Sequence, residues 1–288
     1  MEMTDFGGAI KPVEEHPDYK IAIIGIPFDE KSSYLKGAAK GPQAIREAST
    51  VKSGNAWTEL VVNLEEDTVI VDLGDIDVRG KTIEIFSRIE KRIGEIVEKG
   101  AVPIVLGGDH SISYPVVRAF AKKFNSLDIL HFDAHPDLYE ELYGDPFSHA
   151  CPFARILEKG LAQNLVQVGI RAATGSQRAN ASKHRVRMIE MKDIKDTLSL
   201  EFSNPLYISF DLDSLDPAFA PGVSHHEPGG LSTRQVLAII QGLKARIVGL
   251  DVVELNPSRD LSGITAAAAV KVVKEVAGKI VKGDKEEI

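Results

Sequence analysis

The sequence predicts an α/β protein with a mostly parallel β-sheet, because short apolar runs alternate with segments of helical periodicity. Eight of these runs are rich in β-branched residues and are candidate strands. Most of them are apolar on both faces, as strands must be in a parallel sheet that helices cover on each side. The eight runs are residues 21–26, 69–73, 103–106, 128–132, 165–170, 186–189, 206–210 and 247–250.

Helical patterns occupy several of the intervals between these runs. In residues 83–97 apolar side chains recur every three or four positions, and Gly100 is a typical residue after the end of a helix. Ser232 with Gln235 three residues later forms a capping box, which predicts that a helix begins there. A further helix is predicted over residues 266–280.

The composition indicates a folded protein, and we expect one domain over residues 1–288. Apolar residues make up 43% of the chain and charged residues 26%, which is enough apolar side chain for a sizeable core. No linker rich in proline, glycine or serine and no repeat divides the chain. The candidate strands also continue at similar spacing from residue 21 to residue 250.

Charge and cysteine content limit the partners and the compartment. The net charge is −8 and no basic block occurs, so no nucleic acid partner is expected. No apolar stretch approaches the roughly 20 residues that span a membrane. Cys151 is the only cysteine, which excludes an intrachain disulfide and a zinc site of several thiolates. Residues 1–12 show no signal-peptide pattern, so we expect a cytoplasmic protein.

Polar clusters follow four of the candidate strands, at residues 107–111, 133–137, 211–216 and 251–254. The carboxyl ends of parallel strands form the edge where open α/β sheets bind their ligands. Residues two apart on an extended chain project from the same face, as do Asp133, His135 and Asp137, and also Asp211 and Asp213. Carboxylates packed this closely repel one another, so a cation is expected to keep them ionised.

The donor atoms of these clusters predict two Mn²⁺ ions. Carboxylate oxygens with a minority of imidazoles, here His110 and His135, suit Mn²⁺, whereas metals that prefer thiolates lack their donors. The four aspartates at positions 133, 137, 211 and 213 carry four negative charges, which two divalent cations balance. One divalent cation would leave the same cluster negative.

Simpler interpretations of the same residues exist. A single aspartate after a strand is commonly a helix cap or turn residue, and a single histidine is commonly a hydrogen-bonded neighbour. Neither explains why imidazoles and paired aspartates recur at one sheet edge. Ser111 lies outside any Gly-x-Ser-x-Gly elbow. Cys151 lies two positions after His149 in the sequence, and we expect no thiol nucleophile there.

Four motifs resemble the signatures of the ureohydrolase family, which comprises the arginases and agmatinases. They are GGDHS at 107–111, DAHPD at 133–137, SFDLDSLDP at 209–217 and DVVELNP at 251–257. The resemblance extends from about residue 21 to residue 277. It implies a three-layer α/β/α sandwich with a central eight-stranded sheet, and a homo-oligomer of three or six chains.

The resemblance also implies a binuclear manganese centre and the residues that act on the substrate. One ion would be bound by His110, Asp133, Asp137 and Asp211, and the other by Asp133, His135, Asp211 and Asp213, so that Asp133 and Asp211 bridge. The two ions would activate a shared water that attacks the guanidinium carbon. Asp137 would hold the attacking group, His149 would carry a proton to the leaving amine, and Glu254 would pair with the guanidinium.

Two of these residues have alternatives. Glu254 could instead bind a helix terminus or an arginine. The family usually has glycine after the proton-carrying histidine, and this chain has Ala150. Residues 148–150 and 223–228 are closer to the plant-type arginase branch. Within the second segment, His225 and His226 could line the pocket or face solvent.

The expected substrate is a small cationic guanidino compound, and we favour agmatine, which would give putrescine and urea. The loop 138–145 contains Glu140, Glu141 and Asp145, which would attract the amine of agmatine if they face the pocket. Typical arginases bind the arginine carboxylate with an Asn/Ser/Thr run that is missing from this loop. Residues 169–174 also lack the acids that animal and bacillar arginases use on the α-amino group.

Three alternatives to agmatinase remain open. The first is an arginase, which converts L-arginine to ornithine and urea. The second is a formiminoglutamate hydrolase, which would need a basic residue in this acidic loop. The third is a non-catalytic, metal-binding family member, which would be expected to lack one of the six ligands.

Overall fold

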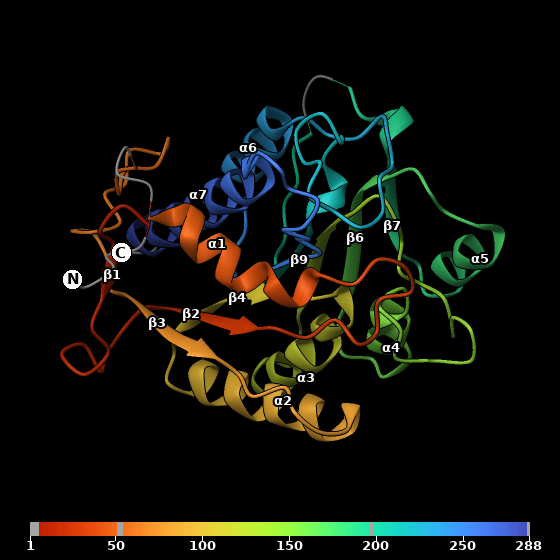
Figure 1. Ribbon diagram of the computed structural model, residues 1–288, viewed down its shortest axis with the longest axis horizontal. Helices are drawn as coiled ribbons and strands as arrows, with labels where there is room; N and C mark the ends of the chain where they lie inside the picture. Colours follow the sequence, from red (N-terminus) through yellow and green to blue (C-terminus); the bar gives the residue numbers. More distant parts are fainter. Residues whose placement is uncertain (1–5, 51–53, 196–197, 287–288) are drawn as a thin grey trace.

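The computed structural model describes residues 6–50, 54–195 and 198–286, and all its strands belong to one parallel sheet (Figure 1). Nine strands occur in these ranges, in the order β1-β3-β2-β4-β9-β8-β5-β6-β7. They are β1 (Ile10–Lys11), β2 (Ile21–Ile26), β3 (Ile70–Asp75), β4 (Val102–Gly107), β5 (Asp128–Phe132), β6 (Asn164–Ile170), β7 (Arg187–Glu190), β8 (Leu206–Asp211) and β9 (Ile247–Val253).

The predicted α/β class is confirmed, and each of the eight predicted strands has its counterpart. The expected number of strands is one too low, because β1 pairs with β3 at the edge of the sheet. This strand has two residues, which is too short for any hydrophobic pattern to predict.

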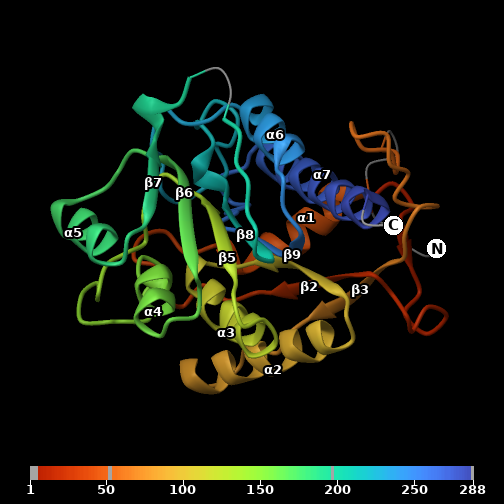
Figure 2. The same ribbon diagram turned by 180° about the vertical axis from the view of Figure 1, so that it is seen from behind.

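Helices lie on both sides of the sheet (Figures 1 and 2). They are α1 (Gly41–Ser49), α2 (Thr82–Glu98), α3 (Ser113–Lys123), α4 (Pro152–Glu158), α5 (Gly175–Lys183), α6 (Thr233–Gly242) and α7 (Ile264–Glu286). The helices predicted over 83–97, from 232 and over 266–280 correspond to α2, α6 and α7. Ser232 caps α6 with the predicted capping box. None of the helices in the described ranges is both long and apolar enough to cross a membrane.

Two hydrophobic cores form, one on each face of the sheet. Helices α1, α6 and α7 cover one face, and α2 and α3 cover the other. Successive residues of a central strand enter opposite cores, since Ile104 and Leu106 lie in the first and Val105 lies in the second. Strands buried on both faces explain why the runs are continuously apolar. Two cores on one sheet support the prediction of one domain over residues 1–288, which stays a prediction.

The strand order brings together the four segments that carry polar clusters. Strands β4, β9, β8 and β5 are neighbours at the centre of the sheet, although they are far apart in the chain. Their carboxyl ends therefore open at the same edge. After β4 the chain passes close to the loop that follows β2. A Cβ at Gly108 would lie 1.9 Å from the carbonyl oxygen of Phe28, so only glycine allows this approach.

Candidate metal centre and active site

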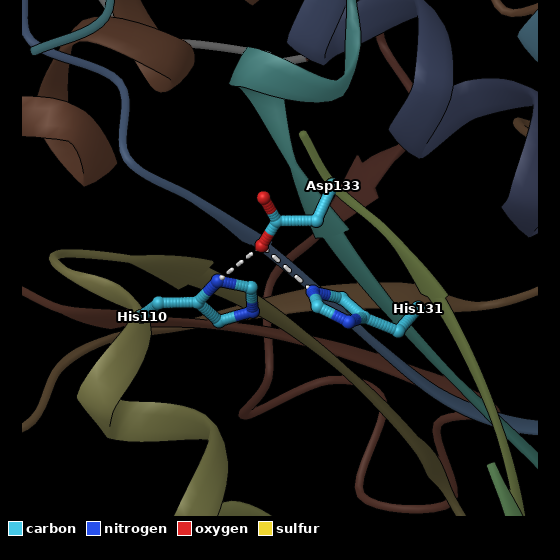
Figure 3. A group of neighbouring side chains, drawn as sticks. All are labelled: His110, His131 and Asp133. Carbon is cyan, nitrogen blue, oxygen red and sulfur yellow. Dashed lines mark hydrogen bonds and ion pairs between the residues drawn. The ribbon is translucent and has the colours of Figure 1, made fainter. Parts of the chain in front are cut away.

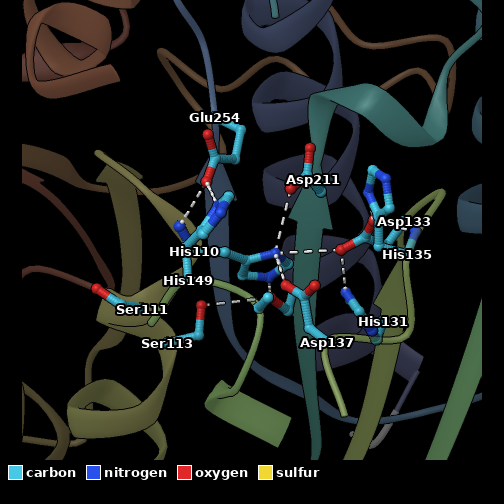
Figure 4. A network of polar contacts seen from close by, with 12 residues as sticks. His110, Ser111, Ser113, His131, Asp133, His135, Asp137, His149, Asp211 and Glu254 are labelled. Atoms are coloured by element: carbon cyan, nitrogen blue, oxygen red, sulfur yellow. Dashed lines mark hydrogen bonds and ion pairs between the residues drawn. The ribbon is translucent and has the colours of Figure 1, made fainter. Parts of the chain in front are cut away.

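The six predicted metal ligands meet at the carboxyl ends of the central strands (Figure 4). His110 lies in a short 3₁₀ helix after β4, and Asp211 is the last residue of β8. The other four are Asp133, His135, Asp137 and Asp213. Beside them is a cavity of about 190 Å³, which His135, Asp137, Asp211 and Asp213 help to line. His110 and Asp133 are buried, with no exposed surface.

Three carboxylates converge on one nitrogen of His110. Its Nδ1 lies 3.2 Å from Asp133 Oδ2, 3.1 Å from Asp137 Oδ2 and 3.1 Å from Asp211 Oδ2. This buried nitrogen has no partner that meets hydrogen-bond geometry among the described residues. A nitrogen and three carboxylate oxygens gathered in this way are a suitable donor set for a divalent cation. The geometry therefore fits a metal ion at this position.

A chain of hydrogen bonds sets the tautomer of His110. The Ser209 hydroxyl donates its proton to Asp251 Oδ1 over 2.7 Å, so it must accept from His110 Nε2, 2.9 Å away. The proton of the imidazole is therefore on Nε2, and the lone pair of Nδ1 faces the carboxylates. Asp251 is fully buried and also accepts from the hydroxyls of Ser113 and Tyr207. Hydrogen bonds behind a ligating histidine orient it and tune its affinity for metal.

The second half of the cluster is arranged around His135. Its Nδ1 lies 3.0 Å from Asp213 Oδ2 and 3.4 Å from Asp133 Oδ1. Its Nε2 faces Glu227 Oε1 at 3.5 Å. Asp133 thus presents Oδ2 to His110 and Oδ1 to His135. This arrangement is the one that a carboxylate bridging two ions requires.

His131 supports Asp133 from inside β5 (Figure 3). Its Nε2 lies 2.8 Å from Asp133 Oδ2, and its Nδ1 accepts a hydrogen bond of 3.0 Å from the Gln167 amide. Its ring stacks on Phe153 with the centroids 3.9 Å apart. Burial lowers the pKa of His131, which keeps the ring neutral with its proton directed at Asp133. Sequence analysis missed this residue, although a histidine inside a buried strand is a usable signal.

When no cation is bound, the close packing of the carboxylates favours their protonated forms. Burial, together with the charge of Asp133, raises the pKa of Asp213 to about 6. Burial and the charges of Asp213 and Asp133 also raise the pKa of Asp211 well above its usual value. Divalent cations would remove this repulsion and keep the carboxylates ionised. The charges of the cluster therefore fit bound metal, as does its geometry.

His149 and Glu254 form a buried pair next to the cluster (Figure 4). His149 Nδ1 lies 3.0 Å from Glu254 Oε1, which also accepts a 3.0 Å hydrogen bond from the backbone N–H of His110. Burial opposes protonation of His149, but the hydrogen bond and charge of Glu254 outweigh it, and the pKa of His149 rises to about 9. Both residues line the pocket.

The backbone is unusual at Glu254 and at Asp137. Glu254 has a φ of 65° and Asp137 a φ of 50°, values in the left-handed region that residues other than glycine rarely adopt. The backbone N–H of Glu254 is held by the carbonyl of Gly108 at 2.9 Å. Such conformations persist where the surroundings enforce them, commonly at functional sites. Here they occur at two of the three residues for which catalytic roles are predicted.

The condition that the acids of the loop 138–145 face the pocket is not met, because none of them lines it. Glu140 and Glu141 line a separate cavity that also includes Lys183. Asp145 pairs with Lys31 at 2.8 Å. From this loop, Tyr139 and Leu142 line the pocket. The loop bends back on itself, with a bridge between Leu142 and Asp145.

The two neighbouring histidines of the segment 223–228 behave differently. His225 lines the pocket, where its ring centroid lies 5.4 Å from that of His149 and 6.0 Å from that of His135. His226 is absent from the lining that the described residues form, and its Nε2 contacts the carbonyl oxygen of Pro221 at 2.7 Å.

Ser33 is a pocket residue that sequence analysis did not single out. Its hydroxyl lies 2.8 Å from His149 Nε2, and its backbone N–H donates to the same nitrogen over 3.2 Å. Ser33 lies in the loop after β2, in a polar stretch without a recognisable motif.

A parallel α/β sandwich with a cluster of carboxylates and imidazoles at its central strand ends is typical of metal-dependent hydrolases. The profile of the Arginase family matches residues 19–278, and the chain belongs to this family. The resemblance in the sequence motifs is thereby confirmed, and the protein is a hydrolase that acts on guanidino C–N bonds.

Plant arginases are among the most similar relatives. The mitochondrial arginase of Medicago truncatula is 46% identical over 91% of this chain and 82% of its own length. Arginase 2 of Arabidopsis thaliana, named chloroplastic/mitochondrial, is 44% identical over 91% of this chain and 80% of its own length. The mitochondrial agmatinase of Gallus gallus is 37% identical over 88% of this chain and 79% of its own length. The solved arginase structure from Medicago truncatula superposes with a TM-score of 0.87 at 44% identity, covering 91% of this chain and 88% of that one.

These names contradict the expectation of a cytoplasmic protein. The plant relatives are described as mitochondrial or as chloroplastic/mitochondrial arginases. A single cysteine and an acidic composition do not distinguish such compartments from the cytoplasm, because all of them are compatible with a protein without disulfides.

Proposed function

We propose that this chain is an arginase, which hydrolyses L-arginine to L-ornithine and urea with two Mn²⁺ ions. Identity supports this substrate over agmatine, since the Medicago arginase is 46% identical and the chicken agmatinase 37%. The proposal replaces our preference for agmatine, which depended in part on the acids of the loop 138–145. Their carboxylates belong to a separate cavity and to an ion pair with Lys31.

The lining of the pocket is the observation that carries this proposal. Away from the candidate ligands, its wall includes Ser33, Tyr139 and Gln177, which are polar but uncharged. Gln177 Oε1 is buried and has no hydrogen-bond partner among the described residues. A side-chain amide offers an acceptor and donors, which match the α-ammonium and α-carboxylate of an amino acid. Agmatine has an ammonium group and no carboxylate.

The metal ions would be held by the six predicted ligands. His110 and Asp137 would hold one ion, His135 and Asp213 would hold the other, and Asp133 and Asp211 would contribute to both. Carboxylate oxygens with two imidazole nitrogens suit Mn²⁺. When bound, the two ions would supply a water activated for attack near neutral pH.

The chain's own residues would position the substrate and move its protons. The Glu254 contacts with His149 and His110 both use Oε1, so Oε2 is available to accept from the guanidinium. Asp137 would accept a hydrogen bond from the attacking water. His149, which Glu254 keeps protonated, would provide the proton that the leaving amine needs.

The test is to incubate Mn²⁺-loaded protein with L-arginine, agmatine, guanidinobutyrate, guanidine and formiminoglutamate. Urea is measured for the guanidino compounds, and formamide or ammonia for the formimino compound. We expect the highest kcat/KM for L-arginine, with ornithine as the second product. A higher kcat/KM for agmatine would overturn the substrate, and no urea from any guanidino compound would overturn the activity. Light scattering of the same sample tests whether three or six chains assemble, as the family resemblance implies.

A further inference from the structure

We propose that His225 is a substrate-binding residue whose imidazole accepts a hydrogen bond from the guanidinium, alongside Glu254. This inference rests on the proposed hydrolysis of a guanidino group. The sequence left open whether His225 lines the pocket or faces solvent, and the structure places its side chain in the pocket wall.

The imidazole of His225 is free to bind a ligand. The other two histidines of the pocket wall have charged partners, since His135 Nδ1 lies 3.0 Å from Asp213 and His149 Nδ1 lies 3.0 Å from Glu254. Neither nitrogen of His225 has a hydrogen-bond partner in the described part of the chain. A substrate that displaces water from this ring must replace the lost hydrogen bonds, because an unpaired polar group is costly.

The ring of His225 contacts both parts of the site that the guanidinium must reach. Its centroid lies 5.4 Å from that of His149, the partner of Glu254, and 6.0 Å from that of His135, a candidate metal ligand. The carbon under attack must lie beside the candidate metal centre while its N–H groups reach Glu254. His225 therefore borders the space that the guanidinium would occupy.

A guanidinium has more hydrogen-bond donors than Glu254 can pair. The guanidinium of arginine has five N–H groups, and Glu254 Oε1 is already used by His149 and by the backbone of His110. At about pH 8.5, two units above the usual pKa of histidine, the His225 ring is neutral and one of its nitrogens is an acceptor. That nitrogen would pair an N–H group that Glu254 leaves unpaired.

The chain on each side holds His225 in place without help from its imidazole. On one side the Ser224 hydroxyl donates to the carbonyl of Leu35 over 2.7 Å. On the other side the carbonyl of Glu227 accepts from Arg171 Nε over 2.8 Å. A change of the His225 ring should therefore leave the loop where it is.

The change His225→Phe keeps a ring and removes the acceptor, and the neighbouring His226→Phe is the matched control, since His226 is absent from the pocket lining that the described residues form. At about pH 8.5 and saturating Mn²⁺, we expect His225→Phe to lower kcat/KM for L-arginine about tenfold or more, as the loss of a hydrogen bond to a charged group does. Its Mn²⁺ content should be unchanged, and His226→Phe should match the wild type. An unchanged kcat/KM in His225→Phe would overturn the proposal.

Restoring the acceptor separates the hydrogen bond from a structural role. The amide oxygen of His225→Asn lies near the position of Nδ1, and that of His225→Gln near the position of Nε2. We expect one of the two to recover kcat/KM to within about threefold of the wild type. If neither variant exceeds His225→Phe, the imidazole does not act as an acceptor.

Compounds with different heads show which group of the substrate His225 binds. Agmatine and guanidinobutyrate share the guanidinium with arginine, and their inhibition constants are measured as competitors of arginine hydrolysis. In His225→Phe both constants should rise by about the factor by which kcat/KM for arginine falls. A loss confined to arginine would place the contact at the amino-acid head and overturn the proposal.

The role of His225 and the proposed function fail in different ways. A wild type that releases urea while His225→Phe retains full kcat/KM overturns the role of His225 alone, whereas a wild type that releases no urea overturns the proposed function. Should the wild type prefer agmatine, agmatine becomes the substrate and arginine the competitor in the same comparison.

Discussion

The Ser209 hydroxyl donates to the Asp251 carboxylate over 2.7 Å, and this bond determines which nitrogen of His110 carries the proton. Because Ser209 has used its own proton, it can only accept from His110 Nε2. The lone pair of Nδ1 is thereby directed at the carboxylates of Asp133, Asp137 and Asp211.

We expect Ser209→Ala to weaken Mn²⁺ binding about 10- to 100-fold, because His110 loses the bond that sets its tautomer. Titration of metal-free protein with Mn²⁺, followed calorimetrically, measures the change. Ser113→Ala is the matched control, since Ser113 donates to the same Asp251 over 2.6 Å without contacting the Nε2 of His110. Equal affinities in the wild type and Ser209→Ala would contradict the role.

Asp133→Ala should reduce the metal content to one ion per chain or none, because Asp133 faces His110 and His135 with different oxygens. Elemental analysis after dialysis measures the stoichiometry. Asp216→Ala is the control from a neighbouring motif, since the Asp216 carboxylate binds backbone N–H groups of Ala218 and Gly229. Two ions retained by Asp133→Ala would show that the carboxylate does not bridge.

His149→Ala should slow turnover by about 10²- to 10⁴-fold while both metal ions remain bound, because the variant loses the acid–base group and no predicted ligand. Steady-state urea release and metal analysis on one sample check both statements. His226→Ala, whose side chain binds the carbonyl of Pro221, should retain full activity. If His149→Ala keeps wild-type turnover, His149 has no part in the reaction.

We expect kcat to decrease at alkaline pH. Burial favours neutral His149, but Glu254 raises the pKa to about 9. The protonated ring is the acid, so the active fraction is complete well below pH 9 and is lost as the pH rises through that value. Measurement of kcat from pH 7 to 10.5 at saturating Mn²⁺ and substrate tests this. A kcat that still rises above pH 10 would exclude His149 as the acid.

Gln177→Glu should shift the substrate preference from arginine toward agmatine. A carboxylate at this position would repel the α-carboxylate of arginine and attract the amine of agmatine. We expect the ratio of kcat/KM for agmatine to that for arginine to rise at least about tenfold, which corresponds to about 1.4 kcal/mol. Glu140→Gln is the control, because Glu140 lines the separate cavity, and its ratio should not change. An unchanged ratio in Gln177→Glu would remove Gln177 from substrate recognition.

The hydrophobic pattern predicted where strands end better than which strands pair. Run 128–132 coincides with β5, and the polar residues after it are the candidate ligands. The pairing of Ile104 in β4 with Leu250 in β9 joins distant parts of the chain, and no local pattern encodes it. The sequence motifs therefore predict that the polar clusters share one edge of the sheet. The strand order that forms the pocket is known only from the structure.

The residues behind the candidate ligands were visible in the sequence but not interpreted. His131, Gln167 and Ser209 are polar residues within predicted buried strands, where an unpaired polar group would be costly. Each of them bonds to a ligand or to a ligand's partner. Ser33 had no such signal, because it lies in a polar loop and its contact partner His149 is far along the chain.

The place of β9 in the sheet has a consequence for protein synthesis. Of the described strands, β9 is synthesised last, yet it lies between β4 and β8 and is the strand that joins them. Before residues 247–253 leave the ribosome, the segment carrying His110 and the segments carrying the aspartates belong to separate halves of an incomplete sheet. A nascent chain therefore holds no finished cation-binding cluster. The cluster can therefore be completed only after residues 247–253 have entered the sheet between β4 and β8.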